Sequence, residues 1–245
     1  AHFVPVTMLI TAAIYGAASC VTFALLPERA QPQAARGEGS AWRRLRKTFG
    51  EARAHRDFMW LLACTVCYQG GVAVAITLAA IYAEQVIGFV PHETMVLIFV
   101  LNIAAALGAF GFGYVQDRIG HRLALALTLV AWIAVCLVAA TATSKGQFWI
   151  AATIAGLAMG SSQSAGRAMT GVLAPPRQLA EFFGLWSFAT RLASIVGPMG
   201  YGLITWATGG NQRIATLAST GLFVAGIALL LPIDMRRGRT VALAA

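Results

Sequence analysis

The segment Gly113-Tyr-Val-Gln-Asp117-Arg118-Ile-Gly120-His-Arg122 is short, polar and basic, and it lies between two long apolar runs. Each run, at about 95–115 and 123–143, has the roughly 20 residues that a helix needs to cross the hydrocarbon core of a bilayer. Charged side chains are costly in hydrocarbon. We therefore predict that this segment is a turn at one surface of a membrane, and that the chain crosses the bilayer before and after it.

The composition also favours a membrane protein. Hydrophobic residues make up 58% of the 245 residues and charged residues only 11%, whereas roughly a quarter of an average soluble domain is charged. The chain starts at Ala1 inside an apolar run, without Met and without the basic segment of a signal peptide. We therefore expect a fragment or a processed piece of a longer protein.

Seven apolar runs are long enough to span a bilayer, which predicts an all-α membrane protein with seven transmembrane helices. The runs lie at about 3–26, 58–87, 95–115, 123–143, 148–173, 182–207 and 214–231. Helices have to start or stop at the prolines beside these runs, which are Pro27, Pro91, Pro175, Pro176 and Pro232. We divide the chain into a first helix at 1–28, a loop at 29–57, a six-helix domain at 58–235 and a basic tail at 236–245.

The loop at 29–57 is the most basic stretch, with eight Lys or Arg residues against three acidic ones. Trp42, Leu45, Phe49 and Ala52 recur at helical spacing after Ser40, a candidate N-cap. The pattern predicts either a basic amphipathic helix that lies on anionic lipid or a solvated linker.

The distribution of basic residues predicts the orientation, because cytoplasmic connections are enriched in Lys and Arg. The net charge of +9 would suggest nucleic acid as a partner for a soluble protein, but here we expect none. With alternate crossings, fourteen basic residues fall on one side: eight in the loop, two in the opening turn, Arg177 and three in the tail. Only Lys145 and Arg213 fall on the other side. We therefore expect the loop and the C-terminus in the cytoplasm.

Two further arginines lie within predicted spans, which makes them candidate functional residues. Arg191 is about eleven residues into its span, roughly 16 Å deep and close to the middle of the bilayer. Arg167 is about seven residues from the end of its span, so its side chain either extends to the membrane surface or faces a cavity.

Both arginines lie on helical stripes of small and polar residues. The stripes are Gly156, Gly160, Gln163, Ser164 and Gly171 on one helix and Gly184, Ser187, Ser194 and Pro198 on the next. Such stripes serve either close helix packing or a polar path through the membrane. For the glycines alone we favour packing, whereas the arginines favour a cavity.

The second run has Gln69-Gly70-Gly71 near its centre. Glycines at mid-span permit a helix break, and broken helices hold the substrates of many transporters. Tyr68 and Gln69 would then offer polar groups to a substrate, and a kink that only serves packing is the alternative. Gly197 and Pro198 form a second candidate break, in the sixth run.

Other classes of protein have little support. Cys64 and Cys67 have the spacing of half a zinc or redox site, but neither a second cysteine pair nor a nearby His accompanies them. We therefore expect packing residues there, and neither a metal nor a cofactor. No Asp, Glu, Lys or His lies deep in a predicted span, and no His lies beside a candidate nucleophile. We expect that the protein is not an enzyme.

The opening segment, as Gly113-x-x-x-Asp117-Arg118-x-Gly120-x-Arg122, resembles the signature loop of the major facilitator superfamily. That loop lies between the second and third helices of each six-helix half, and the segment here follows the second run of the block that starts at 58. Three further stretches are similar to one branch, the bacterial relatives of the autophagy-related vacuolar effluxer family. They are Ala79-Ala-Ile-Tyr-Ala83, Gly156-Leu-Ala-Met-Gly-Ser-Ser-Gln163 and Ala180-Glu-Phe-Phe-Gly-Leu-Trp186.

The resemblance implies the C-terminal half of a twelve-helix transporter, with 3–26 as helix six and with the N-terminal half as the missing partner. It implies secondary transport, as efflux, of a small solute such as an amino acid across a bacterial inner membrane. The sequence departs from the family at Gln69-Gly70-Gly71, where Asn-Asp-Gly is frequent, and at Arg191, where Lys is common. Coupling carried by that Asp is therefore not implied. The alternative function is a membrane scaffold that does not transport.

The resemblance also assigns roles to particular residues. The expected substrate-binding residues are Tyr68, Gln69, Gln163, Arg167 and Arg191. The arginines would pair with an anionic group of the solute, although an acidic group of the missing half is an alternative partner for Arg191. In the signature loop, Asp117 would cap the N-terminal end of a helix in the missing half, and Gly113 would allow that helix to approach. Arg118 and Arg122 would hold the cytoplasmic face.

Overall fold

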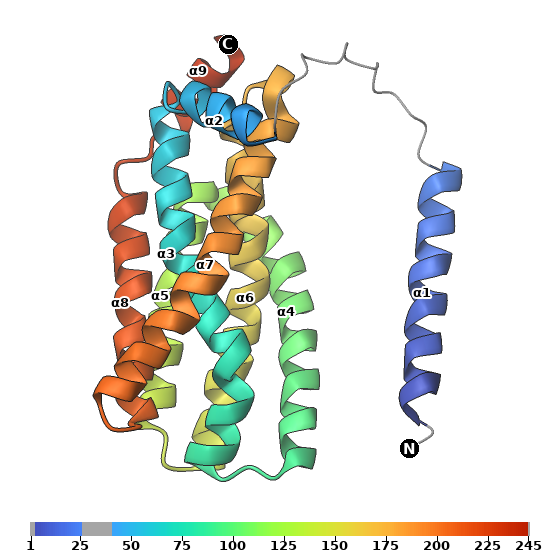
Figure 1. Cartoon of the computed structure of the whole chain (residues 1–245), viewed down its shortest axis with the longest axis vertical. Helices are drawn as coiled ribbons and strands as arrows, with labels where there is room; N and C mark the ends of the chain where they lie inside the picture. The colour runs from blue at the N-terminus through green and yellow to red at the C-terminus, as the bar shows by residue number, and fades with distance from the viewer. Residues whose placement is uncertain (1–2, 26–40, 245) are drawn as a thin grey trace. The chain divides into compact units, whose positions relative to one another are not determined.

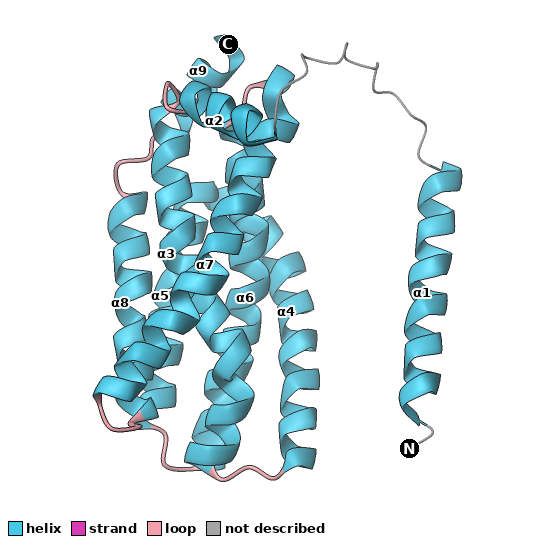
Figure 2. Cartoon of the chain, in the orientation of Figure 1, coloured by secondary structure: helices cyan, strands magenta, loops and turns pink. Residues whose placement is uncertain are grey.

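The computed structural model describes residues 3–25 and 41–244, and these residues are helical apart from short connections (Figure 2). The chain divides into two units, Ala1–Ala41 and Trp42–Ala245. In the first unit, α1 (Phe3–Leu25) is a single helix, and its described side chains are all exposed. This exposed apolar surface suits a helix surrounded by lipid or by other helices. The sequence predicts a helix at about 3–26, which are nearly the same residues.

The second unit is a bundle of long helices (Figure 1). Its elements are α2 (Ala41–Ala52), α3 (Arg56–Tyr82), the short π-helix η1 (Ala83–Ile87), α4 (Pro91–Ile119), α5 (His121–Thr141), α6 (Lys145–Leu173), the 3₁₀ turn η2 (Pro176–Gln178), α7 (Leu179–Ala207), α8 (Gln212–Leu230) and α9 (Met235–Ala244). The neighbouring pairs are α4 and α6, α3 and α7, α5 and α6, α3 and α8, and α5 and α8. In Figure 1, α2 lies across the end of the bundle that also carries α9.

Six of the described helices are long and apolar enough to cross a membrane, rather than the expected seven. The helix that falls short is α6, because the polar stretch Ser161-Ser-Gln-Ser164 lowers its mean hydropathy. Its 29 residues give it the length of a span, and it packs along α4 and α5 within the bundle. The expectation of an all-helical membrane protein is confirmed, whereas the count of seven spans is not.

The core of the bundle consists of aromatic and aliphatic side chains from most of its helices. The largest fully buried ones include Phe58, Tyr68, Trp132, Phe182 and Phe223. The rings of Trp132 on α5 and Phe223 on α8 stack with their centroids 5.4 Å apart. These contacts hold α3, α5, α7 and α8 around one centre.

Three glycines bring the backbones of α4 and α6 together, and we call this contact the α4–α6 seam. A Cβ atom added to Gly108 would overlap the backbone of Leu157, and one added to Gly160 would overlap the carbonyl oxygen of Ala105. A Cβ atom added to Gly156 would lie 2.5 Å from the carbonyl oxygen of Leu101. The preference for packing at Gly156 and Gly160 is therefore confirmed, since small residues allow helices to approach closely.

Helices α3 and α7 cross at Gly70 and Gly197, which we call the α3–α7 crossing. A Cβ atom on Gly197 would overlap the carbonyl group of Gly70. Both helices are continuous there, and Pro198 lies inside α7. The expected helix breaks at Gly70, Gly71, Gly197 and Pro198 are therefore wrong for this structure. Because Gly70 and Gly197 have no side chains, the backbones of α3 and α7 can touch there. Gly71 instead lies against the ring of Phe223.

The opening segment of the sequence forms the end of α4, a turn and the start of α5, as predicted. Gly120 makes the turn with φ 86° and ψ 151°, a conformation that glycine adopts without the strain of a side chain. The amide nitrogen of buried Gln116 lies 2.6 Å from Nδ1 of His121, across the turn. Arg122 donates to the carbonyl oxygen of Leu231 at 2.7 Å and so ties the turn to the end of α8.

The basic residues after 235 form α9, which is docked on the bundle. Asp57, in the first turn of α3, accepts two hydrogen bonds from the guanidinium group of Arg237, at 2.6 and 2.9 Å. Asp57 also accepts one from the backbone N–H of Asp234 at 2.8 Å. Gly238 lies so close to Leu173 that it has no room for a side chain. We call this arrangement the α3–α9 clasp.

Two ionisable groups beside the clasp have shifted pKa values. The pKa of Asp234 lies below its ordinary value because its carboxylate accepts hydrogen bonds from the backbone N–H groups of Arg237 and Arg236. This cap therefore stabilises α9 at a pH above the ordinary aspartate pKa, and the contribution is lost as the pH falls through the lowered pKa. Burial lowers the pKa of His55, which packs edge-on against Phe182.

Candidate functional site

The structure joins two of the expected site residues directly. Gln69 on α3 and Gln163 on α6 exchange two hydrogen bonds, since each amide nitrogen donates to the other amide oxygen at 3.2 Å. Gln69 is buried and Gln163 is partly exposed. A reciprocal amide pair satisfies one donor and one acceptor on each side chain and leaves further capacity for a ligand. The sequence predicted both residues but not their pairing.

Arg167 lies one turn after Gln163 on the same helix, and its side chain is exposed. Its guanidinium carbon lies 5.9 Å from the centre of the Trp186 ring on α7. A cation near the face of an aromatic ring is attracted to it. This contact orients the guanidinium group toward the α7 side while its hydrogen-bond donors stay available.

Arg191 lies on α7 between Trp186 and the α3–α7 crossing. Its side chain is exposed, and it forms no ion pair or side-chain hydrogen bond with any residue that the structure describes. Two residues later, the carbonyl oxygen of Ala193 would lie 3.7 Å from a Cβ on Gly70, which is next to Gln69. Arg191 therefore lies in the part of α7 that crosses α3, but its side chain is on the opposite face of α7 from Ala193, because two residues turn a helix by about 200°.

Tyr68 lies in the core next to this group. It is fully buried, and its hydroxyl group packs against Gly166 of α6, without a hydrogen-bond partner in the described part of the chain. The indole nitrogen of Trp186 is likewise buried and unpartnered. The role of Tyr68 in substrate binding stays a prediction.

The signature loop has an open side. Asp117 and Arg118 are exposed and form no ion pair with any described residue, and Gly113 has no neighbour within 4 Å of an added Cβ. The expected contacts of Gly113 and Asp117 were with a helix outside this chain. Within the chain, Arg122 and Gly120 have the structural roles described above.

A second feature was not predicted from the sequence. A cavity of about 270 Å³ lies among α3, α4, α5, α6, α7 and α8, between the level of Gly71 and that of Tyr82. Its walls are mostly apolar and include Trp132 and Met159, and its polar lining residues include Asn102, Thr216 and Ser219. A cavity between helices has no signature in any one helix, because each contributes a few ordinary apolar residues.

Metal chemistry has no support in the described residues, since no group of three or more His, Cys, Asp or Glu side chains lies together in residues 3–25 and 41–244. Gln69, Gln163 and the exposed Arg167 can instead bind an anionic group, and the hydrogen bonds from the guanidinium group are charge-assisted. The site suits binding rather than covalent chemistry.

Comparisons with known proteins agree with this chemistry. Residues 2–243 match the family described as vacuole effluxer Atg22 like. The uncharacterized MFS-type transporter YxiO of Bacillus subtilis is 27% identical over 191 residues, which is 78% of this chain and 44% of YxiO. Autophagy-related protein 22-1 of Penicillium rubens is 26% identical over 220 residues, covering 83% of this chain and 37% of that protein. The resemblance found in the sequence is confirmed.

Solved structures share the fold. The fucose:proton symporter FucP of E. coli superimposes with a TM-score of 0.69 at 17% identity, over 93% of this chain and 54% of FucP. A bacterial homolog of the human lysosomal transporter Spinster, in an inward-facing conformation, gives 0.62 at 15% identity, over 91% of this chain and 57% of its own. The chain therefore spans about half of these structures, and less than half of the curated relatives it matches. YxiO, FucP and the Spinster homolog are named as transporters, which agrees with a protein that is not an enzyme.

Proposed function

We propose a transport function from the premise that this chain belongs to the family of vacuole effluxer Atg22-like proteins. The chain would supply the C-terminal half of a secondary transporter that exports a small solute, such as an amino acid or a related metabolite, by alternating access. The single observation that carries the proposal is the pair Gln69 and Gln163 with the exposed cation Arg167 one turn along α6. Arg191 is a further exposed cation, on α7. Charged groups within apolar helices are costly and usually mark a substrate path.

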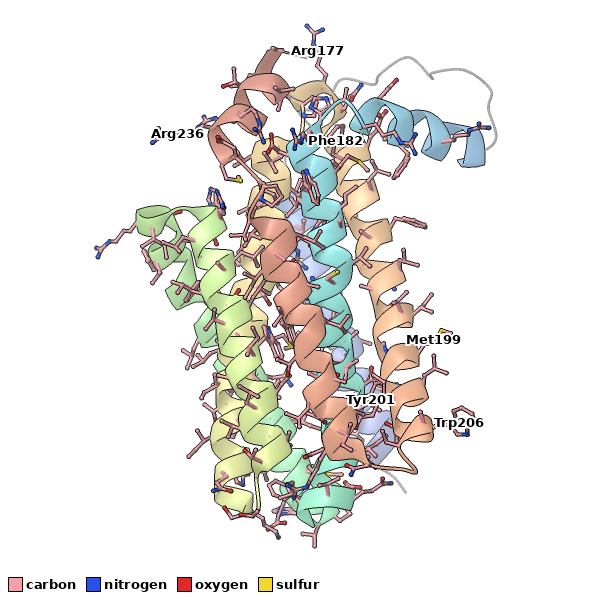
Figure 3. All side chains as sticks on the ribbon, turned by 90° about the vertical axis from the view of Figure 1, so that its left-hand side faces the viewer. Arg177, Phe182, Met199, Tyr201, Trp206 and Arg236 are labelled. Atoms are coloured by element: carbon pink, nitrogen blue, oxygen red, sulfur yellow. The ribbon has the colours of Figure 1, made fainter. Side chains whose placement is uncertain are left out.

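The share of the relatives that the chain covers, between 37% and 57%, supports the assignment to half a transporter. So do the exposed apolar side chains on α7. Figure 3 shows Met199 and Trp206 pointing away from the bundle, whereas Tyr201 and Phe182 point into it. In the complete protein, the first half would cover part of this surface and close the site.

The proposed topology has seven spans, with α6 as the polar one. A helix that carries substrate-binding groups has a lower hydropathy than its neighbours and inserts because they shield it. The basic loop, the signature turn and α9 would lie in the cytoplasm of a bacterium, and the protein in its inner membrane. Ser40 and the rest of 26–40 lie outside the described residues. Of the two alternatives for the loop, α2 matches the helix.

The decisive experiment uses the full-length natural protein in liposomes. Arg191→Ala should lower kcat/KM for an anionic or zwitterionic solute by at least about tenfold, because a charge-assisted hydrogen bond to the substrate is lost. Arg177→Ala, an exposed cation on η2 (Figure 3), is the matched control and should leave the rate unchanged. Transport of every such solute at the wild-type rate by Arg191→Ala would refute the site. Absence of flux under every gradient would favour the membrane scaffold instead.

The signature loop would act as a gate latch in this transporter. Asp117 would cap a helix of the first half and so stabilise the outward-open state. Asp117→Asn should therefore increase the accessibility of cysteines introduced on the cytoplasmic side. Arg118→Gln is a comparison variant in the same turn. Unchanged accessibility in the Asp117 variant would contradict the latch.

A further inference from the structure

A groove of about 620 Å³ lies where α5 begins and α8 ends, outside the site described above. Leu123 and Ala126 of α5 line one wall, and Ile227 and Leu230 of α8 line the other. Met235, at the start of α9, also lines it. The walls are thus apolar and come from two helices that are apolar enough to span a membrane.

Two arginines stand at the rim of this groove. Arg122, in the signature turn, uses one Nη atom to bind the carbonyl oxygen of Leu231 at 2.7 Å. Arg236, in the first turn of α9, is exposed, and its guanidinium group has no partner in the described part of the chain. Figure 3 shows Arg236 pointing away from the bundle. Asp234 is the acidic residue at the rim, and it already accepts two backbone hydrogen bonds.

The position of the groove decides what kind of ligand it suits. Because α5 and α8 are candidate spans, the ends of these helices lie at the level of the lipid headgroups. A ligand at this depth has a polar end at the rim and an apolar end along the helices. A free phosphate ion would use the arginines but leave the apolar walls uncovered.

We propose that this groove binds an anionic phospholipid. Its phosphate accepts charge-assisted hydrogen bonds from Arg122 and Arg236, and one acyl chain lies between Ala126 and Ile227. The signature turn, α8 and α9 are thereby held together by a lipid as well as by the hydrogen bond from Arg122. The proposal is independent of the transport activity, because it concerns bound lipid.

Native mass spectrometry of the full-length natural protein, titrated with phosphatidylglycerol or phosphatidylcholine, tests the proposal. Phosphatidylglycerol should bind at least about fivefold more tightly than phosphatidylcholine, and Arg236→Ala should reduce its binding by about fivefold. Arg239→Ala removes the same charge from the next turn of α9, outside the groove, and should have little effect. Ala126→Phe fills the space beside the apolar wall without changing the charge. It should weaken the binding of phosphatidylglycerol but not the binding of inorganic phosphate.

Three outcomes would overturn the proposal. Equal losses from Arg236→Ala and Arg239→Ala would mean that general surface charge binds the lipid. Equally tight binding of phosphatidylglycerol and phosphatidylcholine would show that the arginines do not select an anionic lipid. Undiminished lipid binding by a folded Ala126→Phe variant would show that no acyl chain occupies the groove.

Discussion

The two closest helix pairs in the bundle are built differently. In the α4–α6 seam, three glycines bring backbone against backbone at Gly108, Gly156 and Gly160. At the α3–α7 crossing, backbone contact is concentrated at Gly70 and Gly197, and the glycines at 184, 200 and 202 of α7 have no neighbour within 4 Å of an added Cβ. In the seam, several backbone contacts fix the spacing and the angle of the helices. At the crossing, the angle depends on side chains such as Phe58 on α3 and Phe182 on α7, whose ring centroids are 4.5 Å apart. We infer that the α4–α6 seam tolerates an added methyl group less well than the α3–α7 crossing.

The largest effect should come from Gly160→Ala. The new Cβ overlaps the carbonyl oxygen of Ala105, and the neighbouring contact at Gly156 prevents the seam from adjusting. Overpacking of this kind costs about 3 kcal/mol. The thermal unfolding midpoint and the folded yield in detergent measure it. Gly146→Ala on the same helix, which meets no neighbour, is the control. Equal stability of both variants would show that the seam is not tight.

Gly197→Ala should have the next largest effect, with a different signature. The added methyl group overlaps the carbonyl group of Gly70, but the other contacts between α3 and α7 include side chains, which can adjust, so the stability loss should be about 1 to 2 kcal/mol. Transport should fall more than stability, because the crossing lies next to Gln69. Flux per folded molecule in liposomes separates the two effects, and a proportionate loss of both would argue against a role of the crossing in transport.

Gly70→Ala should be far milder than its partner substitution. A Cβ on Gly70 meets its neighbours at 3.6 to 3.7 Å, which is ordinary contact, and alanine in a helix recovers about 0.5 to 1 kcal/mol relative to glycine. The expected change in the free energy of unfolding is within about 0.5 kcal/mol. A loss as large as that of Gly197→Ala would mean that the two helices approach in another geometry.

The smallest effect on the bundle is expected from Gly184→Ala. Nothing lies within 4 Å of the added Cβ, so the isolated bundle should gain about 0.5 kcal/mol from helix propensity. In the full-length protein the same substitution reports on whether another helix covers this face of α7. A gain in both forms would show that the face stays open, whereas a loss confined to the full-length form would locate a helix of the other half.

The sequence was sufficient for most helices, because long apolar runs and prolines define them. At α6 it predicts a span, and the polar stretch Ser161-Ser-Gln-Ser164 makes this helix less apolar than the six candidate spans. The sequence was misleading at Gly70 and Gly197. A glycine pattern permits a break or a close contact, and only the opposite helix decides between them. For the site, Gln69 and Gln163 were identified, but their pairing depends on the relative depth and rotation of α3 and α6, which no single helix specifies.

The positions of Tyr68 and Asp57 could not be predicted from the sequence for the same reason, since they depend on the neighbouring helices. Tyr68 is next to Gln69, yet a rotation of about 100° per residue turns it into the core. In the sequence Asp57 is one of the three acidic residues of the loop at 29–57, and Arg237, which binds it, belongs to the basic tail at 236–245. Long-range pairs of this kind depend on which elements become neighbours.

The α3–α9 clasp also sets an order of events during synthesis. Asp57 leaves the ribosome 180 residues before Arg237, an interval on the order of ten seconds or more at ordinary elongation rates. Until then, the carboxylate of Asp57 in the first turn of α3 has no guanidinium partner. The other helices of the bundle can therefore pack together before α9 docks on them. The first turn of α3 is therefore completed only by residues of α9, which are translated long after it. A nascent chain that stops before α9 would remain open at the end that carries α2.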